Sequence, residues 1–499
     1  MSLDGSFILA LDLGTTGNRA IIFDKNQGII SSIYEEFPQE YPRPGWVEHN
    51  PELIWKSVRL ILSRTFKKIP IKKIVSMGIT NQRETALLWN KKTGKPIYNA
   101  IVWQCRRTAP LCEKLKSKGL GRMIHRETGL FLDPYFSASK ITWLLDNVRG
   151  ARAESKAGKL LAGTIDTWII WKLSGGRLHV TDTSNASRTM LFNIHTKSWD
   201  EKLRRIFRIP KAILPKIVPS SGVVGMMDKK LFGGALPISG VVGDQQAASF
   251  AQGCFGPGIV KNTYGTGLFM LENTGKIPRF SKHLLTTVAW SIGDIKKTEY
   301  AIEGSVFIGG AAIQWLRDKL RIFKRADETE KIAESISSNG DVYFVPALVG
   351  LGAPYWDAHA RGAILGITRG TSQAHIVRAA LEANAYHTRD ILEIMRKHTK
   401  HPFKTLRVDG GASANDFLMQ FQADILGIPI ERPKILETTA LGAAGLAGIA
   451  VGFWKNKEEF NRLRKIQKVF RPATRFSGRN ELYAKWKEAV ARARNWAED

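Results

Sequence analysis

The sequence has few cysteines and no apolar run long enough to cross a membrane. Cys105, Cys112 and Cys254 form a sparse, odd-numbered set without metal-binding spacing, so the sequence indicates neither disulfides nor a zinc site. The longest uncharged apolar run, residues 438–454, is shorter than the roughly 20 residues that span a bilayer and is rich in Gly and Ala. We therefore expect this run to form a buried helix.

The first residues lack the pattern of a signal peptide. Residues 1–6 include an acid and no basic segment ahead of an apolar one. Together with the lack of a membrane-spanning run, this predicts a cytoplasmic protein with no membrane partner.

Acidic residues are scarce relative to basic ones. Lys and Arg number 74 against 45 Asp and Glu, which gives a formal net charge of +29. Such an excess can mark binding of nucleic acid or another polyanion. However, the basic residues are dispersed and come without stacking aromatics or a zinc-finger pattern. We therefore expect a highly charged surface without a specific nucleic-acid site.

Two glycine hairpins divide the chain into similar halves. Strands are expected at residues 7–11 and 20–23 around a turn at 14–17, and the pattern returns with strands at 258–260 and 268–271 around a turn at 262–267. A chain of 499 residues exceeds what one core normally supports. The breaker-rich segment 253–258 predicts a boundary, which gives an N-terminal domain at 1–252 and a C-terminal domain at 253–499.

Strands and helices alternate within each half. We expect strands at residues 74–79 and 100–102 in the first half, strands at 342–345 and 363–367 in the second, and a helix at 375–395. The alternation predicts an α/β fold with mixed sheets. The charged segment after Trp454 is expected to be a helical cap on the second domain.

A cation and an anion, Arg83 and Glu84, follow the apolar strand at 74–79. A guanidinium beside a carboxylate can donate to and accept from neighbouring hydroxyls, as binding a small polyol requires. The structural alternative is a solvated ion pair at the end of a strand.

The first hairpin has the composition of a phosphate site. Asp12 ends a strand, Gly14 to Gly17 form the turn with two threonines, and Arg19 follows. Glycines let backbone N–H groups approach an anion, hydroxyls donate, and the acid can hold a cation through water. A glycine turn is often only structural. The second copy at 263–267 favours a nucleotide held between the two domains.

Two further strand ends carry polar groups. Asp244 and Gln245 follow the strand before the expected boundary, where an acid can take a proton from an attacking hydroxyl and help place a metal. Gly410 and Gly411 leave room for a base or ribose against the backbone, and Asn415 can donate and accept hydrogen bonds. The alternatives are an N-cap by Asp244 and a tight turn capped by Asn415. Walker A and protein-kinase signatures are absent.

Taken in order, these segments resemble the FGGY carbohydrate kinase family, which has a two-domain actin-like, ribonuclease H-like ATPase fold with a cleft between the domains. The resemblance covers nearly the whole chain, through residues 12–19, 78–85, 101–107, 133–137, 243–247, 261–267, 362–382 and 409–415. Segments 81–85 and 261–267 are similar to those of members that phosphorylate glycerol.

The resemblance implies ATP-dependent, Mg²⁺-assisted phosphorylation of glycerol to sn-glycerol 3-phosphate by in-line transfer, with Asp244 as general base and with Asp12 and Asp244 at the metal. Residues implied to bind glycerol are Arg83, Glu84, Trp103, Tyr135, Asp244, Gln245 and Phe269. Residues implied to bind ATP are Thr15, Thr16, Gly17, Arg19, Thr266, Gly310, Gln314, Gly411 and Asn415. The family also implies a homodimer or homotetramer.

The chain departs from the family at named positions. Gly17 and Asn18 stand where many members have serines, which removes one hydroxyl from the phosphate site. Bacterial members inhibited by fructose 1,6-bisphosphate have an arginine where this chain has Ala235, so we expect weak or absent regulation.

Two other functions stay open on these grounds. Another FGGY kinase would act on a pentulose, a gluconate-like acid or erythritol. A nucleotide-driven clamp, similar to chaperone ATPases or actin, would hydrolyse ATP without a small acceptor.

Overall fold

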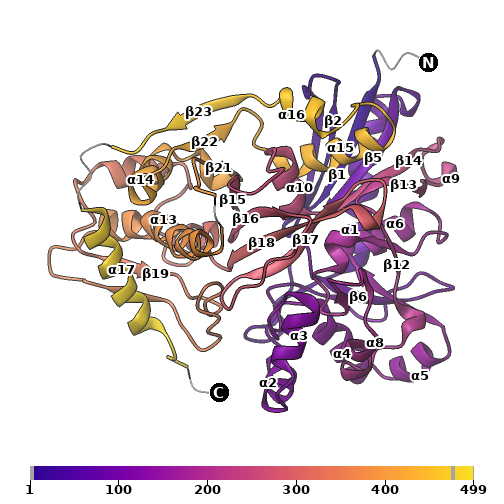
Figure 1. The fold of residues 1–499 in the computed structure, drawn as a ribbon, viewed down its shortest axis with the longest axis horizontal. Helices are drawn as coiled ribbons and strands as arrows, with labels where there is room; N and C mark the ends of the chain where they lie inside the picture. The colour runs from indigo at the N-terminus through magenta and orange to yellow at the C-terminus, as the bar shows by residue number, and fades with distance from the viewer. Residues whose placement is uncertain (1–4, 400, 474–477, 498–499) are drawn as a thin grey trace.

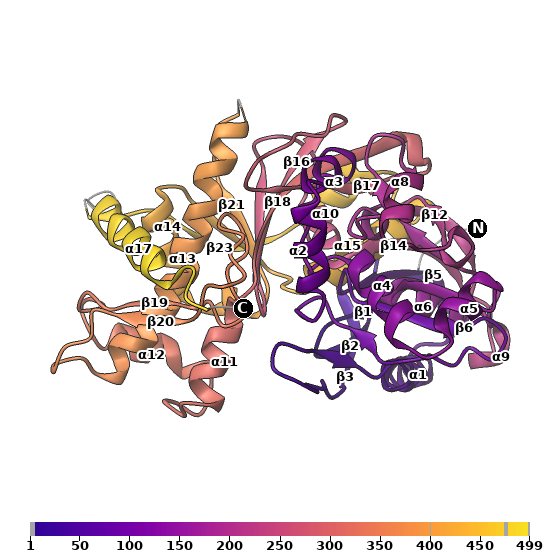
Figure 2. The ribbon, with the colours of Figure 1, turned by 90° about the horizontal axis from the view of Figure 1, so that it is seen from below.

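The computed structural model describes residues 5–399, 401–473 and 478–497. Residues 1–4, part of the segment used to predict the lack of a signal peptide, lie outside the described residues. The chain forms two lobes, each built on a mixed β-sheet with helices packed against it (Figures 1 and 2). The expected α/β class with mixed sheets is thus confirmed.

The first sheet brings the ends of three parallel strands to one edge. Its strand order is β13-β14-β5-β1-β2-β3, with β1 Phe7–Leu13, β2 Gly17–Phe23, β3 Ile29–Glu36, β5 Ile74–Asn81, β13 Ser221–Met226 and β14 Pro237–Gly243. Strands β1 and β14 both run parallel to β5, with Asn81 opposite Leu13 on one side and Gly243 on the other. The residues that follow β5 and β14 therefore emerge beside Asp12.

The second sheet repeats the hairpin of the first. Its order is β17-β18-β16-β15-β21-β22-β23, with β15 Val260–Tyr264, β16 Leu268–Gly275, β17 Leu285–Ser291, β18 Thr298–Val306, β21 Leu406–Asp409, β22 Ile430–Pro433 and β23 Ile466–Phe470. The hairpin β15–β16 is antiparallel, as is β1–β2, and β15 runs parallel to β21 with Thr263 opposite Asp409. The predicted pair of hairpins is confirmed, although β15 continues through Tyr264, so the second turn is shorter than the predicted 262–267.

Smaller elements surround the two sheets. The first lobe adds a sheet of β4 Glu48–His49, β7 Ala100–Ile101, β6 Ala86–Asn90 and β8 Leu160–Thr164, and the pairs β9 Val180–Asp182 with β12 Lys216–Val218 and β10 Phe192–Asn193 with β11 Ser198–Trp199. Its helices are α1 Pro51–Lys68, α2 Ala109–Ser117, α3 Gly121–Thr128, α4 Ser137–Asn147, α5 Ala151–Lys156, α6 Ile165–Leu173, α7 Thr183–Ala186, α8 Glu201–Ile206, α9 Lys229–Phe232 and α10 Asp244–Ala251.

The second lobe contains the longest helix, α13 Gln373–His398, which includes the predicted helix at 375–395. It buries an apolar stripe that includes Val377, Leu381 and Ile391. Besides β21, β22 and β23, the other α-helices and strands that begin beyond residue 300 are α11 Gly310–Asp318, α12 Glu328–Glu334, β19 Tyr343–Val345, β20 Ala363–Leu365, α14 Asp416–Leu426, α15 Thr438–Ala450, α16 Lys457–Arg462 and α17 Arg479–Ala493. The expected strands at 342–345 and 363–367 correspond to β19 and β20.

The all-helical prediction for the segment after Trp454 is wrong in part. Helices α16 and α17 are present, but β23 lies between them and pairs antiparallel with β22. Strand β23 forms an edge of the second sheet, where only Phe470 is buried and the preceding side chains face solvent. Lysine on an exposed edge strand discourages pairing with another chain, so the charge that suggested a helix suits this position too.

The apolar run at 438–454 contains the predicted buried helix, α15, which ends at Ala450, before the end of the run. This helix packs on β5 and β14 of the first sheet and on α10, although it lies far beyond residue 252. The backbones approach closely, because a side chain at Gly78 would overlap the carbonyl oxygen of Ala443. The division of the chain at residue 252 stays a prediction. Among the residues that the structure describes, no helix has the length and apolarity needed to cross a membrane.

Candidate active site

A small cavity of about 130 Å³ lies where the two lobes meet. Its lining residues are Thr15, Arg83, Glu84, Trp103, Tyr135, Asp244, Gln245, Thr263, Gly265, Thr266 and Phe269. All seven residues predicted to bind glycerol are among them, together with Thr15 of the first hairpin and Thr263 and Thr266 of the second. The structure therefore brings the predicted acid, the cation–anion pair and both turns to one place.

The parallel strands explain how Arg83, Glu84 and Asp244 meet. Arg83 and Glu84 follow β5, and Asp244 follows the neighbouring β14 and starts α10. Gly243, not Asp244, occupies the N-cap position of α10, which leaves the Asp244 carboxylate available to the cavity. Glu84 adopts a left-handed backbone with φ of 61°, a conformation that is uncommon outside glycine. Its carbonyl oxygen accepts a hydrogen bond from Ser137 Oγ at 3.0 Å.

A buried network of alternating charges supports the cavity. Arg83 Nε lies 3.0 Å from Asp244 Oδ1, and its Nη1 and Nη2 donate to Glu303 at 2.6 and 3.1 Å. Arg188 donates to Glu84 at 2.6 Å and to the same Glu303 at 3.0 Å. Buried ion pairs of this kind fix side-chain geometry because each charge satisfies the next.

Arg188 and Glu303 were missed from the sequence. Arg188 follows the short helix α7, and Glu303 lies within β18, so neither belongs to a glycine-rich turn or a strand end. One signal was available for Glu303, since it is an acid in the otherwise apolar and small stretch at 301–306. A charge inside a buried strand needs a partner.

The environment shifts the pKa values of the acids in the network. Burial alone would raise the pKa of Glu303, but the charges of Arg188 and Arg83 prevail and lower it to about 2. Burial raises the pKa of Asp244 above its ordinary value, although the charge of Arg83 opposes this effect. Glu303 is therefore a fixed anion, whereas Asp244 is the better proton acceptor near neutral pH.

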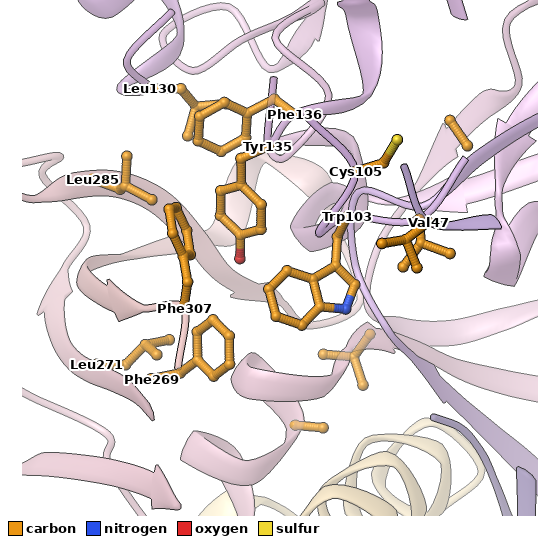
Figure 3. Packing of buried hydrophobic residues seen from close by; sticks show 14 of the residues in the cluster. Val47, Trp103, Cys105, Leu130, Tyr135, Phe136, Phe269, Leu271, Leu285 and Phe307 are labelled. Carbon is orange, nitrogen blue, oxygen red and sulfur yellow. The ribbon is translucent and has the colours of Figure 1, made fainter. Parts of the chain in front are cut away.

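Aromatic rings form one wall of the cavity (Figure 3). The ring of Trp103 lies edge-on to Tyr135 and Phe269, with centroids 5.8 and 5.9 Å apart, and Tyr135 contacts Phe307 at 5.5 Å. Figure 3 shows the Tyr135 hydroxyl directed into the space between these rings. The indole N–H of Trp103 donates to Thr15 Oγ1 at 3.1 Å. This wall can accept the C–H face of a small polyol while hydroxyls pair elsewhere.

A second polar network, centred on Lys261, fixes the side chain of Gln245. Lys261 Nζ donates to Gln245 Oε1 at 2.6 Å and to Thr263 Oγ1 at 2.7 Å. Thr263 in turn donates to Asp409 Oδ1 at 2.5 Å. Burial lowers the pKa of Lys261 to about 8. Sequence reasoning gave Lys261 no individual role, since a lysine within a strand has no distinctive spacing.

In the first hairpin, the two departures from the family have structural reasons. A Cβ atom on Gly17 would lie 2.6 Å from the Tyr34 hydroxyl and 2.7 Å from the Glu35 carbonyl oxygen, so a larger residue has no room. Asn18 is buried and donates to Ser57 Oγ at 3.2 Å, away from the cavity.

The other predicted phosphate contacts of this hairpin lie in different surroundings. Thr15 lines the cavity, and Thr16 is exposed with its hydroxyl 3.5 Å from that of Tyr34. Arg19 forms an ion pair with Glu437, the residue before α15. Arg19 thus links the first hairpin to a segment from the second half of the chain.

The nucleotide contacts predicted for the second lobe are spread more widely. Thr266 lines the cavity, and Gly310 starts α11 and donates its N–H to Gly265 O at 2.9 Å. Gln314 is exposed on α11, and Gly411 has open space around its Cβ direction. Asn415 caps α14 by accepting from Leu418 N at 2.8 Å, as the structural alternative expected. Gly310, Gln314, Gly411 and Asn415 do not line the small cavity.

Asp12 and Asp244 fit the requirements of a Mg²⁺ site. Burial, together with the negative charge of Asp244, raises the pKa of Asp12 to about 7. A divalent cation would relieve this repulsion. The described residues contain no group of three or more acids, histidines or cysteines that could hold a metal. A pair of carboxylates such as Asp12 and Asp244 suits Mg²⁺, which is usually held by one or two carboxylates, waters and substrate phosphates.

The sequence matches the FGGY family of carbohydrate kinases in both halves, with the N-terminal domain at residues 7–251 and the C-terminal domain at 260–451. The chain therefore belongs to this family, and its two lobes have the family's actin-like ATPase fold.

Among individual proteins of this family, the chain is similar to several glycerol kinases over nearly its full length. The chain is 57% identical over 493 residues to glycerol kinase 2 of Thermotoga maritima, covering 98% of this chain and 99% of the relative. It is 56% identical to a glycerol kinase of Caldanaerobacter subterraneus, with 99% of both chains covered. The crystal structure of Plasmodium falciparum glycerol kinase with ADP superposes with a TM-score of 0.88 at 36% identity, covering 98% of both chains.

Proposed function

We propose that the chain transfers the γ-phosphate of ATP to glycerol and forms sn-glycerol 3-phosphate. The observation that carries this function is one small cavity that joins Arg83, Glu84 and Asp244 to an aromatic wall. Supporting evidence comes from the two glycerol kinases that are 56% and 57% identical over nearly the full chain.

Asp244 would accept the proton of the terminal hydroxyl as its oxygen attacks the phosphate. Arg83 holds this carboxylate at 3.0 Å, and the raised pKa brings its basicity closer to the working pH. Glu84 and Gln245 supply polar atoms for the other hydroxyls. Because Lys261 and Arg188 fix these two side chains, the polar groups are ordered before substrate arrives.

The two hairpins would hold the phosphates. Thr15 and Thr266 place a hydroxyl from each lobe at the cavity, and closure of the lobes would exclude water as a competing acceptor. Asp12 and Asp244 would hold Mg²⁺, which when bound supplies positive charge to the transferred phosphoryl group.

The nearest alternative is another sugar or polyol kinase of the same family. A solved xylulose kinase from Lactobacillus acidophilus has a TM-score of 0.86 at 25% identity, so the fold alone does not select the substrate. Steady-state kinetics with glycerol, erythritol, xylulose and gluconate tests the choice. We expect the highest kcat/KM with glycerol, because the cavity is only about 130 Å³. A higher value for a pentulose would overturn the substrate assignment.

A nucleotide-driven clamp is the alternative from another class. ATP turnover measured with and without glycerol separates the two, since a kinase forms ADP in proportion to glycerol 3-phosphate. ADP formation that is independent of glycerol would favour the clamp.

Three properties remain predictions. We expect a homodimer or homotetramer in light scattering, no sequence-specific nucleic-acid binding, and a cytoplasmic location. We also expect fructose 1,6-bisphosphate to leave activity nearly unchanged, because Ala235, on the exposed loop before β14, offers no charge to a phosphate.

A further inference from the structure

A second and larger cavity, of about 550 Å³, lies apart from the residues of the candidate active site. Three segments that pass from one lobe to the other line it. Residues 251–252 connect α10 to β15, residues 433–438 connect β22 to α15, and residues 463–465 connect α16 to β23. Figure 1 shows β23 leaving the second lobe and reaching α16 beside β2 and α15. We call this space the hinge cavity.

The hinge cavity combines an apolar interior with cations at its rim. Ile29, Ile435, Leu436, Leu441 and Leu463 contribute apolar side chains. Lys434 and Lys465 are exposed residues at the rim and lie side by side, because Lys434 N donates to Lys465 O at 2.9 Å.

Some charged and polar groups around the cavity already have ion-pair or hydrogen-bond partners in the part of the chain that the structure describes, and others do not. Glu437 pairs with Arg19, and Arg464 shares the carboxylate of Glu431 with Arg407, at 3.0 and 3.4 Å. The exposed rim lysines are therefore the cations best placed to pair with a ligand. Thr438 also lines the cavity, is 2% exposed, and has a hydroxyl without a hydrogen-bond partner among the described residues.

Two chains of contacts connect the hinge cavity to the active site. Glu437 pairs with Arg19 of the first phosphate hairpin. Gln252 donates to Asp409 at 3.1 Å, and Asp409 accepts from Thr263, whose hydroxyl also accepts from Lys261. A ligand that changed the spacing of the three connecting segments would therefore shift the positions of both phosphate hairpins.

We propose that the hinge cavity is an effector site for a small organic anion with an apolar body, and that its occupancy changes how the lobes close on substrate. The apolar lining would bury the body of the ligand, and Lys434 and Lys465 would pair with its anionic group. The regulatory half of this inference rests on the proposed kinase activity, whereas the binding half does not.

The probe is 8-anilinonaphthalene-1-sulfonate, an aromatic sulfonate whose fluorescence rises in apolar surroundings. The full chain is titrated alongside a variant with Lys434→Glu and Lys465→Glu, which reverses the rim charge without entering the core. A variant with Lys72→Glu and Lys73→Glu, two exposed residues of the first lobe, has the same net charge and serves as control. A third variant, Ile435→Trp, fills the cavity.

We expect the rim variant and Ile435→Trp to weaken probe binding at least about fivefold, with the control unchanged. Glycerol and a nonhydrolysable ATP analogue together should not displace the probe competitively. Equal binding in all four proteins, or competitive displacement, would overturn the site.

The kinetic arm tests regulation separately. Saturating probe should change the KM for glycerol or ATP at least about fivefold, the lower range of typical coupling between sites. The rim variant should keep its basal activity and lose this response. Probe binding in the cavity without any change in KM overturns the regulatory half, while a chain without glycerol kinase activity leaves the binding result standing.

Discussion

Arg83 of the first lobe donates two hydrogen bonds to Glu303 of the second sheet, at 2.6 and 3.1 Å, across 220 residues of sequence. The same guanidinium holds Asp244 at 3.0 Å through its Nε atom. The proposed general base is therefore positioned by a contact between the two halves of the chain, so substitutions in β18 should affect both stability and catalysis.

Glu303→Gln should destabilise the protein by about 3–5 kcal/mol, because it leaves Arg83 and Arg188 buried with one anion fewer. Urea unfolding followed by tryptophan fluorescence measures the change. Glu113→Gln is the matched control, since the Glu113–Lys116 pair is exposed and should contribute little. Equal stability of the two variants would show that the Glu303 network is not required for folding.

The contribution of Glu303 should depend on pH in a defined direction. Its pKa is lowered to about 2 in the folded chain, against an ordinary value near 4.5. A carboxylate with a lowered pKa adds stability that is complete above the unfolded pKa and is lost as pH falls through the folded one. The stability difference between the parent protein and Glu303→Gln should therefore be constant above about pH 5 and shrink toward pH 2. A difference that grows on acidification would contradict this assignment.

Asp244→Asn should lower kcat by about 10²- to 10⁴-fold, the usual contribution of a general base, and leave the melting temperature close to that of the parent protein. Coupled measurement of ADP formation with saturating glycerol and ATP checks the rate. Asp318→Asn, on an exposed side chain, controls for the loss of one charge. A kcat within tenfold of the parent value would remove Asp244 from the mechanism.

Lys261→Met should raise the KM for glycerol by about 10- to 100-fold, as expected when a charged hydrogen-bond donor no longer fixes Gln245. The KM for ATP should change less, because the Lys261 amino group donates to Gln245 and Thr263, neither of which is among the residues predicted to bind ATP. An equal rise in both values would instead indicate a general loss of structure.

Restoring the serine that many family members have at position 17 should harm this chain. Gly17→Ser places a Cβ atom 2.6 Å from the Tyr34 hydroxyl and 2.7 Å from a backbone oxygen, so we expect a loss of about 1–3 kcal/mol. Gly256→Ser is the control, because its Cβ would meet nothing within 4 Å. Thermal unfolding of both variants gives the comparison, and a more stable Gly17→Ser would refute the steric explanation.

Local patterns were sufficient to predict the hairpins, and the family resemblance predicted that Arg83 and Asp244 share a site. Both side chains follow parallel neighbouring strands, and such strand ends share one edge of a sheet. Arg188 and Glu303 could not be found in this way, because their contact spans 115 residues and involves no turn motif.

The remaining differences also arise from tertiary contacts. Strand β23 looks helical by charge, yet it is selected by pairing with β22. Asn415 caps a helix and bonds Thr329 at 3.3 Å, which local sequence could not distinguish from a nucleotide contact. The ion pair of Arg19 with Glu437 forms because α15 packs on the first lobe. The sequence near Arg19 contains no pattern that predicts this contact.

That crossing of α15 bears on any attempt to produce the halves separately. A fragment ending near Ala251 would keep every strand of the first sheet but lose the helix whose backbone lies against Gly78 and Gly240. The uncovered strands β5 and β14 are apolar, so such a fragment should aggregate. Adding α15 back as a separate peptide, or joining it by a linker after α10, should restore a monodisperse species.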